Sequence, residues 1–310
     1  MLAAALDIGG TKTMAGIVDQ DGRVLSQRTF ATYTPDWQRH FEECLEALHA
    51  CMNECGAEQP VGLGINAPGM TDVNRRILCN AVFAGWTNVD VYSYFHQRTS
   101  FSRIIVDNDV NSCAIGELRF GHGSQYRDFV WITVSTGVGG AVVSDGRLVR
   151  GAWGCAGEVG HLKVEYDQPA LCPCGQRGCL EAQGSGTAIG RMMRQAAERN
   201  SEFSARLAQS HLNTDAKTCA MLAAQGDPVC KGILKQAAVY IGRGISYCIN
   251  LLNPKVVILG GGVATSLPLL VDDIQSVVQQ SVISTLQGVE ILYTKNGYNA
   301  AILGAAALVL

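Results

Sequence analysis

The sequence has no excess of positive charge, no hydrophobic run long enough to span a membrane and no Pro- or Ser-rich linker. Its 24 basic and 27 acidic residues give a net charge of −3 at pH 7, which disfavours polyanionic partners such as nucleic acid or an anionic membrane. The longest apolar run near the carboxyl end, residues 300–310, is far shorter than the roughly 20 residues of a membrane helix. We therefore expect neither a nucleic-acid reader nor a membrane protein.

The amino terminus also lacks the pattern of a secretory signal peptide. Asp7 interrupts its apolar run, no basic leader precedes that run, and no Ala-x-Ala cleavage stretch follows it. A cytoplasmic protein is therefore expected. In that compartment the 12 cysteines are better interpreted as reduced thiols or metal ligands than as a disulfide framework.

The composition is that of a globular protein with an unusual share of glycine. Apolar residues make up 47% of the 310 residues, and a chain of this length corresponds to about two domains. The 35 glycines are about 11% of the chain, against a usual share of ~7%. Such an excess marks tight loops in which the backbone approaches another group closely.

Short apolar runs alternate with amphipathic segments along the chain. Strands are predicted at residues 2–8, 13–18, 61–65, 104–106 and 256–259. Helices are predicted at residues 36–55, 181–199, 216–224, 227–252, near 267–281 and from 299 onwards, where apolar residues recur with helical spacing. Strands that alternate with helices indicate an α/β fold.

An internal repeat relates the two halves of the chain. Residues 129–149 contain the same apolar run, glycine loop, apolar run and Asp-Gly turn as the amino-terminal segment. The matching residues, 124 positions apart, are Gly16 and Gly140, Asp21 and Asp145, Gly22 and Gly146, and Arg23 and Arg147. Asp-Gly-Arg turns also recur by chance. The repeat nevertheless predicts two lobes of similar build, joined by packed elements and a hinge.

Three glycine-rich loops have the composition of a nucleotide-binding cradle. Residues 7–13 (DIGGTKT) can present backbone N–H groups and a lysine to phosphate while Asp7 holds magnesium through water. A plain hairpin loop is the alternative, and the spacing is not that of a Walker A loop. Residues 135–140 repeat this chemistry without charge, and residues 260–262 would let a flat ring lie against the backbone. The predicted nucleotide-binding residues are Asp7, Gly9, Gly10, Thr11, Lys12, Ser135, Thr136, Gly137, Gly139, Gly261 and Gly262.

Asn108 and Asp109 stand where a predicted strand ends and a predicted helix begins. Either side chain suits a helix N-cap, and a cap needs only one of them. A carboxylate held in a cleft can instead accept the proton of a substrate hydroxyl as it attacks phosphorus. Both interpretations are compatible with the sequence.

The densest cluster of metal-binding residue types lies between residues 157 and 181. Cys172, Cys174 and Cys179 fall within eight residues, and His161 would complete the four ligands of a closed tetrahedral zinc site. The alternative is three free thiols on a flexible loop. A closed site has no open position for chemistry, so zinc here would be structural and would shape the loop that carries Glu158 and Glu181.

Together these motifs resemble the ROK family of sugar kinases and repressors, within the actin, Hsp70 and hexokinase superfamily. The motifs are DIGGTK at 7–12, EVGH at 158–161, C-x-C-G-x-x-G-C-x-E at 172–181, LGGGV at 259–263 and NAAILGAA at 299–306. The resemblance implies an α/β, two-lobed actin-like ATPase (ribonuclease H-like) fold with a nucleotide and sugar cleft between the lobes. The expected lobes are residues 1–108, with a carboxyl-terminal helix at about 298–310 packing back on them, and residues 109–297, which include the zinc loop.

The resemblance also implies roles for individual residues. Asp109 falls on the family's general base, which touches the sugar, and Asn108 falls on a sugar ligand. Further sugar contacts fall on Gly69, Glu158, His161 and Glu181, and the implied zinc ligands are His161, Cys172, Cys174 and Cys179. His161 would use one ring nitrogen for zinc and the other for sugar.

The implied activity is that of an ATP- and magnesium-dependent kinase acting on the 6-hydroxyl of a hexose, with glucose as the expected substrate. The alternatives are a kinase for N-acetylmannosamine or N-acetylglucosamine, a kinase for allose or fructose, and a non-catalytic sugar sensor. The family's repressors carry a DNA-binding domain ahead of the kinase-like part, and a phosphate loop that begins at Asp7 leaves no room for one. A homodimer is implied by the resemblance alone.

Overall fold

The computed structural model describes residues 1–56, 59–67, 69–74, 76–81, 84–266 and 269–310. The chain divides into two compact units, and each is described here by itself. Unit 1 comprises Met1–Arg127, Asp145–Ala156 and Thr294–Leu310, and unit 2 comprises Asp128–Ser144 and Gly157–Tyr293. Residues 267 and 268, where the helix predicted near 267–281 was expected to begin, lie outside the described residues.

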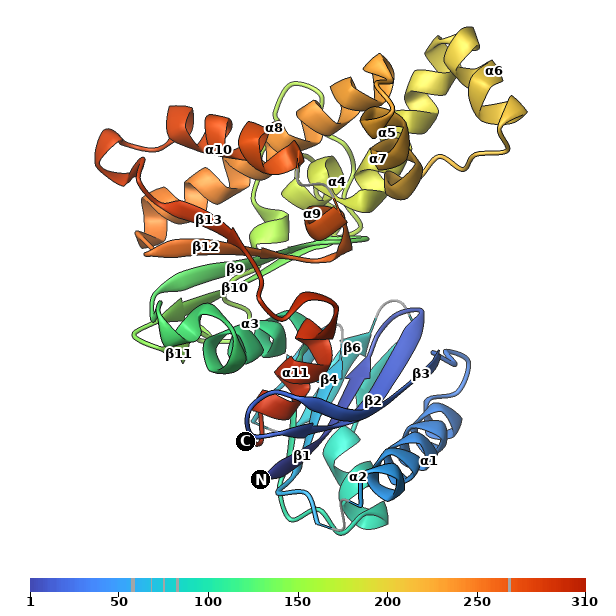
Figure 1. Cartoon of the computed structure of the whole chain (residues 1–310), viewed down its shortest axis with the longest axis vertical. Helices are drawn as coiled ribbons and strands as arrows, with labels where there is room; N and C mark the ends of the chain where they lie inside the picture. Colours follow the sequence, from blue (N-terminus) through green and yellow to red (C-terminus); the bar gives the residue numbers. More distant parts are fainter. Residues whose placement is uncertain (57–58, 68, 75, 82–83, 267–268) are drawn as a thin grey trace. The chain divides into compact units, whose positions relative to one another are not determined.

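Unit 1 is built on a five-stranded mixed sheet with the strand order β3-β2-β1-β4-β8 (Figure 1). Its strands are β1 (Leu2–Ile8), β2 (Lys12–Asp19), β3 (Val24–Ala31), β4 (Leu63–Ala67) and β8 (Ile104–Asn108). The first three form an antiparallel meander, and β4 and β8 continue the sheet as parallel neighbours of β1. Loops that follow β1, β4 and β8 therefore emerge at the same edge of the sheet.

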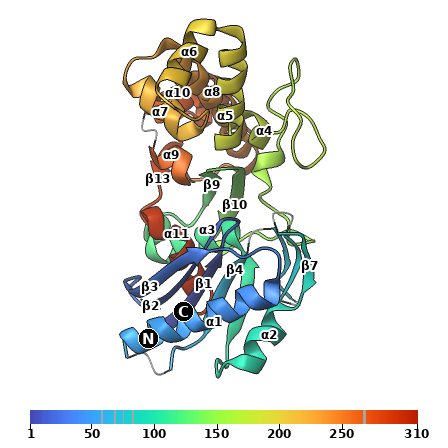
Figure 2. The same cartoon turned by 90° about the vertical axis from the view of Figure 1, so that its right-hand side faces the viewer.

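Helices cover both faces of this sheet (Figure 2). Successive residues of a strand point to opposite faces, so Leu6 of β1 packs with α1 (Trp37–Glu54) and α2 (Val91–Arg98), whereas Ala5 packs with α11 (Ala300–Ala307). α11 also packs against α3 (Asp109–Phe120), and a Cβ on Gly116 of α3 would lie 2.9 Å from the backbone of Gly304. This close approach fixes α3, whose first residue is Asp109.

A three-stranded sheet in unit 1 was not predicted. It consists of β5 (Met70–Asp72), β6 (Ile77–Ala81) and β7 (Trp86–Val89) in sequential order. Gly69 leads into it with a φ of +114°, and a Cβ at this position would overlap the carbonyl oxygen of Asn80. Only glycine tolerates both the positive φ and the close carbonyl oxygen, so the backbone conformation at Gly69 depends on the absence of a side chain.

The second five-stranded sheet has the order β11-β10-β9-β12-β13. Its strands are β9 (Phe129–Val134), β10 (Val138–Ser144), β11 (Arg147–Leu148), β12 (Val256–Gly260) and β13 (Glu290–Tyr293). As in the first sheet, a hairpin comes first in the chain, and two later strands extend the sheet in parallel from its first strand. The two sheets thus share one strand order, as the internal repeat predicts.

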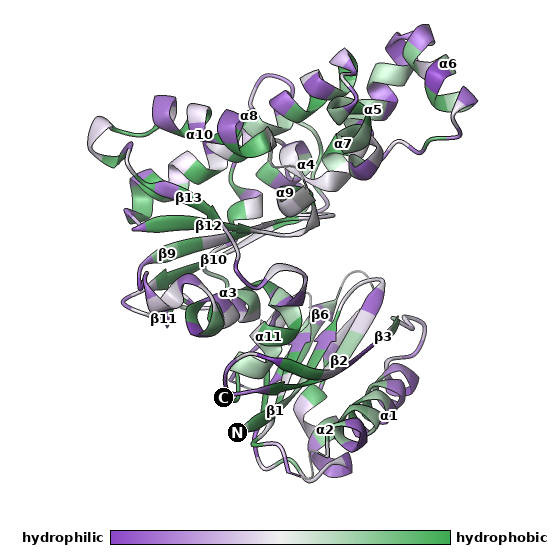
Figure 3. Ribbon diagram, viewed as in Figure 1, coloured by the Kyte–Doolittle hydropathy of each residue, from purple (hydrophilic) through white to green (hydrophobic). Residues whose placement is uncertain are grey.

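The ribbons of β9 and β12 are coloured mainly as hydrophobic (Figure 3). Helices of unit 2 enclose an apolar core against these strands, and its buried residues include Val130, Ile132 and Val257. The helices are α4 (Leu180–Gly184), α5 (Gly186–Arg199), α6 (Ser201–Gln209), α7 (Ala216–Ala224), α8 (Pro228–Leu252), α9 (Gly262–Ser266) and α10 (Leu269–Ser281). Short 3₁₀ turns occupy Val159–His161 and Ser284–Leu286 in unit 2, and His122–Ser124 and Gly297–Asn299 in unit 1.

Three details differ from expectation. The helix predicted over 181–199 is two helices, because Ser185 is extended and its hydroxyl caps α5 by accepting from the Ala188 N–H at 3.1 Å. α6 was not predicted. The structure keeps α3 in unit 1, whereas the expected lobe boundary after residue 108 separates α3 from that lobe, and the packing of α3 on α11 accounts for the difference.

Two general features of the chain bear on the expectations from composition. In the described part of the chain, no helix combines the length and the apolar character that crossing a membrane requires. All 12 cysteines are free thiols. Of the nine outside the predicted metal cluster, six are buried and fill the core. Cys155 is exposed and does not belong to the core.

Candidate functional site

The first glycine loop connects β1 to β2 and is closed by its own backbone. The Gly9 N–H donates to the Lys12 carbonyl at 3.0 Å, and a Cβ on Gly9 would lie only 2.6 Å from the same oxygen. Just after β3, the Thr32 N–H donates to the Thr11 carbonyl at 3.1 Å. The Lys12 ammonium donates to the hydroxyl of Tyr298. The loop is thus a tight, tied turn at the edge where β1 ends.

Asp7, at the end of β1, is a carboxyl group with 9% of its surface exposed. Its pKa is raised from 3.8 to about 7, mainly by burial and also by the Asp109 carboxylate, while a hydrogen bond from Asn66 and the charge of Lys12 oppose the shift. The Asn66 amide donates to Asp7 Oδ1 at 3.4 Å. Two neighbouring carboxylates of this kind are stabilised by a divalent cation, so Asp7 suits the magnesium-binding role that the sequence predicts.

The raised pKa of Asp7 predicts a pH-dependent effect of Asp7→Asn on stability. Because the folded protein favours the protonated form, this carboxyl contributes stability that is full below pH 3.8 and is lost as the pH rises through about 7. Asn stays neutral, so in EDTA the variant should match the wild type near pH 4 and be more stable at pH 8 by up to about 4 kcal/mol. Denaturant unfolding at the two pH values measures this difference.

Asp21→Asn is the matched control for that measurement, because Asp21 is an exposed carboxylate in the same unit. We expect its free energy of unfolding to track the wild type at both pH values. An Asp7→Asn protein less stable than the wild type at pH 8 would contradict the assigned environment of Asp7.

Asn108 and Asp109 divide the two roles that the sequence left open. Asn108 is the N-cap of α3, because its Oδ1 accepts from the Val110 N–H at 2.9 Å and the Asn111 N–H at 3.2 Å. Its Nδ2 donates to the Gly69 carbonyl at 3.1 Å. Asp109, in the first turn of α3, is therefore not needed as the cap. It lies close enough to Asp7 to raise that residue's pKa.

Asp107 is a neighbouring residue that sequence reasoning did not single out. Its side chain is buried and forms a two-pronged ion pair with Arg150, with N–O distances of 2.5 and 3.2 Å. Asp107 Oδ1 also accepts from the Asn108 N–H at 2.8 Å. The pair therefore fixes the strand end from which Asn108 and Asp109 project. In the sequence, Asp107 is only an acidic residue at the end of a strand. Its pairing with Arg150 could not be predicted, because Arg150 lies far from it in the sequence.

In unit 2, a cavity of about 750 Å³ opens beside the second and third glycine loops. Of the predicted nucleotide-binding residues, Ser135, Thr136 and Gly262 line it. The other walls come from α5, from α7 and the two residues before it, and from α9, and they were not predicted. These additional residues are Gly186, Thr187, Gly190, Arg194, Thr214, Asp215, Ala216, Lys217, Ala220 and Val263. The volume lies within the range of cofactor pockets, about 300–1,000 Å³.

The amino end of α5 holds the second glycine loop in place. The Gly186 N–H donates to the Ser135 carbonyl at 2.8 Å, and the Thr187 hydroxyl donates to the Thr136 carbonyl at 2.8 Å. In the third loop, Gly261 has a φ of +88°, and a Cβ there would lie 2.5 Å from the Val134 carbonyl oxygen. Both loops therefore depend on close backbone approach, as the glycine excess indicates.

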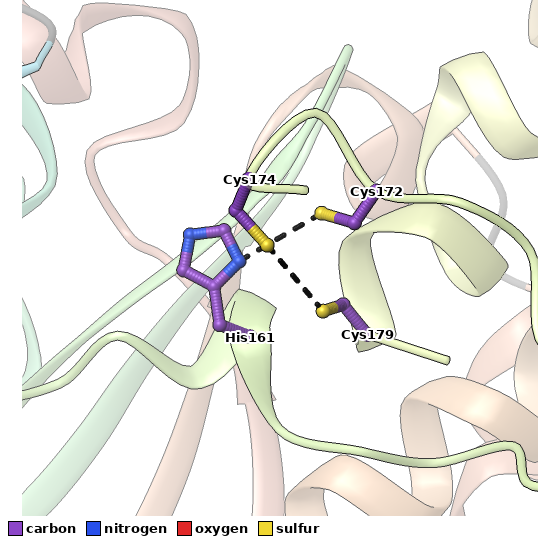
Figure 4. Close-up of side chains that lie close together, drawn as sticks. All are labelled: His161, Cys172, Cys174 and Cys179. Carbon is purple, nitrogen blue, oxygen red and sulfur yellow. Dashed lines mark hydrogen bonds between the residues drawn. The ribbon is translucent and has the colours of Figure 1, made fainter. Parts of the chain in front are cut away.

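His161, Cys172, Cys174 and Cys179 come together in unit 2, with one ligand atom of each within 4.8 Å of the others (Figure 4). The Sγ atoms of Cys174 and Cys179 are 3.7 Å apart, and His161 Nδ1 is 3.8 Å from Cys172 Sγ. Sulfur atoms bound to tetrahedral zinc at about 2.3 Å lie roughly 3.8 Å from one another, so the donor set and its spacing fit zinc. The spacing is too long for a disulfide.

The local backbone and charges favour this cluster. Gly175 and Gly178 both have positive φ, which turns the chain so that the three thiols face one another. The Lys163 ammonium donates to Cys179 Sγ at 3.1 Å. A hydrogen bond from the Gln176 N–H, together with the charge of Lys163, lowers the pKa of the Cys174 thiol. These contacts favour the thiolate form of Cys174, which is the form that binds metal, whereas burial raises the pKa of the Cys172 thiol to about 12.

The three predicted sugar-binding side chains of unit 2 lie next to this cluster. His161 turns its Nδ1 to Cys172 and its Nε2 toward Glu158, 3.8 Å from Oε2. Glu181 follows Cys179, the N-cap residue of α4, and its Oε1 is 3.8 Å from Cys172 Sγ. Its Oε2 accepts from the Val138 N–H at 3.2 Å, and a Cβ on Gly137 would collide with it. Glu181 therefore links the cysteine cluster to the second glycine loop.

The pattern of the ROK family matches residues 3–310. The chain belongs to the ROK family. The glucokinase of Thermotoga maritima is 32% identical to it over 309 residues, which cover 98% of this chain and 96% of that protein. The N-acetylmannosamine kinase of Escherichia coli O157:H7 is 32% identical over 248 residues, covering 79% and 78% of the two chains.

A solved ROK family structure shares the fold of the whole chain. The ROK family glucokinase from Streptomyces griseus, determined in complex with glucose and AMPPNP, superposes with a TM-score of 0.83 at 32% identity. The match covers 100% of this chain and 99% of that one. The predicted fold class, the two-lobed actin-like fold of the ROK family, is confirmed.

Proposed function

We propose that the protein is an ATP-dependent hexose kinase that transfers the γ-phosphoryl group to the 6-hydroxyl of glucose. The position of Asp109 carries this proposal. It is a carboxylate in the first turn of α3 and lies near the buried Asp7. It does not cap the helix, because Asn108 is the N-cap. Such a carboxylate suits a general base, because it can take the proton of the sugar hydroxyl as the hydroxyl oxygen attacks phosphorus.

The glycine loops and the cavity of unit 2 suit the nucleotide. In this proposal the adenosine occupies the cavity beside Gly262, and the loop at 135–137 of unit 2 suits phosphate through its backbone N–H groups. In unit 1, the loop at 9–12 suits phosphate through Lys12 and the N–H groups that its own turn does not use. Asp7 would hold magnesium through water, and the ion would neutralise phosphate charge. Phosphoryl transfer needs little covalent chemistry from the protein, so positioning by these loops is their main contribution.

The cysteine cluster supports a structural zinc ion in the same proposal. His161, Cys172, Cys174 and Cys179 supply all four positions of a closed tetrahedral site, so no position is open for chemistry. Zinc would fix the loop that presents Glu158, His161 and Glu181 to the sugar hydroxyls. Each of these side chains can hold a sugar by hydrogen bonds, and His161 has one ring nitrogen turned away from the thiols.

Glucose is the proposed sugar because two glucokinases match this chain over nearly its full length. N-acetylmannosamine is the second candidate, since the kinase for that sugar has the same identity over a shorter stretch. A homodimer belongs to the proposal as well, on the strength of the family resemblance alone.

A coupled ADP-release assay across glucose, mannose, allose, fructose, N-acetylglucosamine and N-acetylmannosamine tests the sugar assignment. We expect kcat/KM for glucose to exceed that for either N-acetylhexosamine by at least about tenfold. A higher kcat/KM for N-acetylmannosamine would reverse the order of the two candidates. No turnover with any sugar, with sugar binding retained in calorimetry, would instead indicate a sensor.

A further inference from the structure

His40 is a buried histidine in unit 1 that the proposed reaction does not use. It lies on α1 with none of its surface exposed, among the rings of Phe30, Phe41 and Trp86. Its Nε2 is 2.9 Å from the Thr13 hydroxyl, and its Nδ1 is 3.3 Å from the Tyr33 backbone nitrogen. Both ring nitrogens therefore have polar partners, and Cys44 Sγ and Glu43 Oε2 lie farther away, 3.8 Å from Nε2 and 3.9 Å from Nδ1.

Those partners determine which nitrogen of His40 carries the proton. A backbone N–H can only donate, so Nδ1 must accept from Tyr33, and the proton of the neutral ring is then on Nε2. Burial also lowers the pKa of His40, opposed by the nearby Glu43 carboxylate, which is consistent with a neutral ring. His40 Nε2–H is thus the donor to the Thr13 hydroxyl oxygen.

The Gly9 carbonyl determines the direction of the next two hydrogen bonds, those between Thr13 and Thr32 and between Thr32 and Gly9. The Thr32 hydroxyl is 2.8 Å from the Gly9 carbonyl oxygen, which can only accept, so the single Thr32 proton is used there. The Thr32 oxygen is 3.0 Å from that of Thr13 and must accept from it. These hydrogen bonds therefore form a chain in which every donor points the same way, from His40 through Thr13 and Thr32 to Gly9.

This chain of hydrogen bonds ends in the first glycine loop. Thr32 holds this loop at two points, because its hydroxyl binds the Gly9 carbonyl and its backbone N–H binds the Thr11 carbonyl at 3.1 Å. Both carbonyl oxygens are thereby occupied. A carbonyl oxygen turned toward a phosphate would repel it. A loop whose carbonyls accept hydrogen bonds from Thr32 can instead offer its remaining N–H groups, other than that of Gly9, and the further donor hydrogens of Lys12.

We propose that His40, Thr13 and Thr32 are positioning residues that hold the loop at residues 9–12 in its phosphate-binding shape through this directed hydrogen-bond chain. The inference rests on the proposed function, which assigns that loop to the phosphates of ATP. If these hydrogen bonds served only to stabilise the fold, their loss would affect folding but would not change the KM for ATP separately from the KM for glucose.

Thr32→Val and Thr32→Ser form a matched pair that tests the proposal. Valine keeps the branched shape but loses the hydroxyl, so we expect the KM for ATP to rise about tenfold, which corresponds to about 1.4 kcal/mol, while the KM for glucose stays within about twofold. Serine keeps the hydroxyl and should restore the wild-type KM for ATP. Equal KM values for ATP in the two variants, or a parallel rise in both KM values in Thr32→Val, would overturn the proposal.

The tautomer of His40 gives a second test that does not depend on activity. ¹⁵N-resolved NMR of the imidazole at pH 7.5 should show a neutral ring protonated at Nε2, with a proton protected from exchange. A ring protonated at Nδ1, or at both nitrogens, would overturn the chain. An inactive wild-type protein would contradict the proposed function, and the NMR measurement would still decide whether the directed chain exists.

Discussion

Asp109→Asn is expected to lower kcat by about 10²–10⁴-fold and to leave the KM for glucose within about threefold of the wild-type value. As the proposed general base, the carboxylate would act only when the sugar hydroxyl gives up its proton, so we expect its loss to affect the transition state far more than substrate binding. Asparagine has nearly the same shape, and the N-cap of α3 is supplied by Asn108 rather than by Asp109. Steady-state kinetics with varied glucose at saturating ATP measure both parameters.

Glu202→Gln is the matched control for this variant. Glu202 is another first-turn carboxylate, in α6 of unit 2, and its replacement also removes a favourable interaction with the helix amino terminus. We expect it to keep wild-type kcat. If Asp109→Asn retained kcat within about tenfold of the wild type, the general-base assignment would fail.

Loss of a metal ligand is expected to have the second-largest effect. Cys174→Ser should reduce the zinc content well below one ion per chain and raise the KM for glucose by at least about tenfold, because removing even an indirect metal partner costs about 10–100-fold. The reason is local. Cys172 lies beside both His161 and Glu181, and Cys179 begins the helix that carries Glu181, so an unpinned loop misplaces the groups proposed to bind sugar. Elemental analysis and glucose-dependent kinetics measure the two effects.

Cys155→Ser controls for the loss of a thiol. Cys155 is also exposed, but it lies outside the cluster, so zinc content and KM should remain at wild-type values. Wild-type protein purified without chelators and found to contain no zinc would contradict the zinc assignment. A Cys174→Ser protein without zinc but with the wild-type KM would show that the metal does not position the sugar-binding groups.

Local patterns in the sequence predicted much of this structure. The period of three and four over residues 36–55 corresponds to α1, and the three glycine loops lie where β1, β9 and β12 end. The cysteine spacing also anticipated the cluster, because two glycines between close thiols can turn the chain within a few residues. Each of these features depends on residues that are near one another in the chain.

Features that depend on distant residues were missed. The sheet β5-β6-β7 has strands of three to five residues, too short for a clear alternating pattern. The walls of the cavity in unit 2 contributed by Arg194 and Lys217 come from helices whose neighbours are set by tertiary packing. Similarly, the pairing of Asp107 with Arg150 and the chain from His40 to Gly9 join elements far apart in sequence.

The most direct test of the proposed kinase activity is ³¹P NMR of the protein incubated with ATP, magnesium and glucose. We predict that the γ-phosphate signal of ATP is replaced by the signals of ADP and glucose 6-phosphate, and that neither appears when Asp109→Asn replaces the wild type over the same period. Release of inorganic phosphate in place of a sugar phosphate, or no consumption of ATP, would contradict the account.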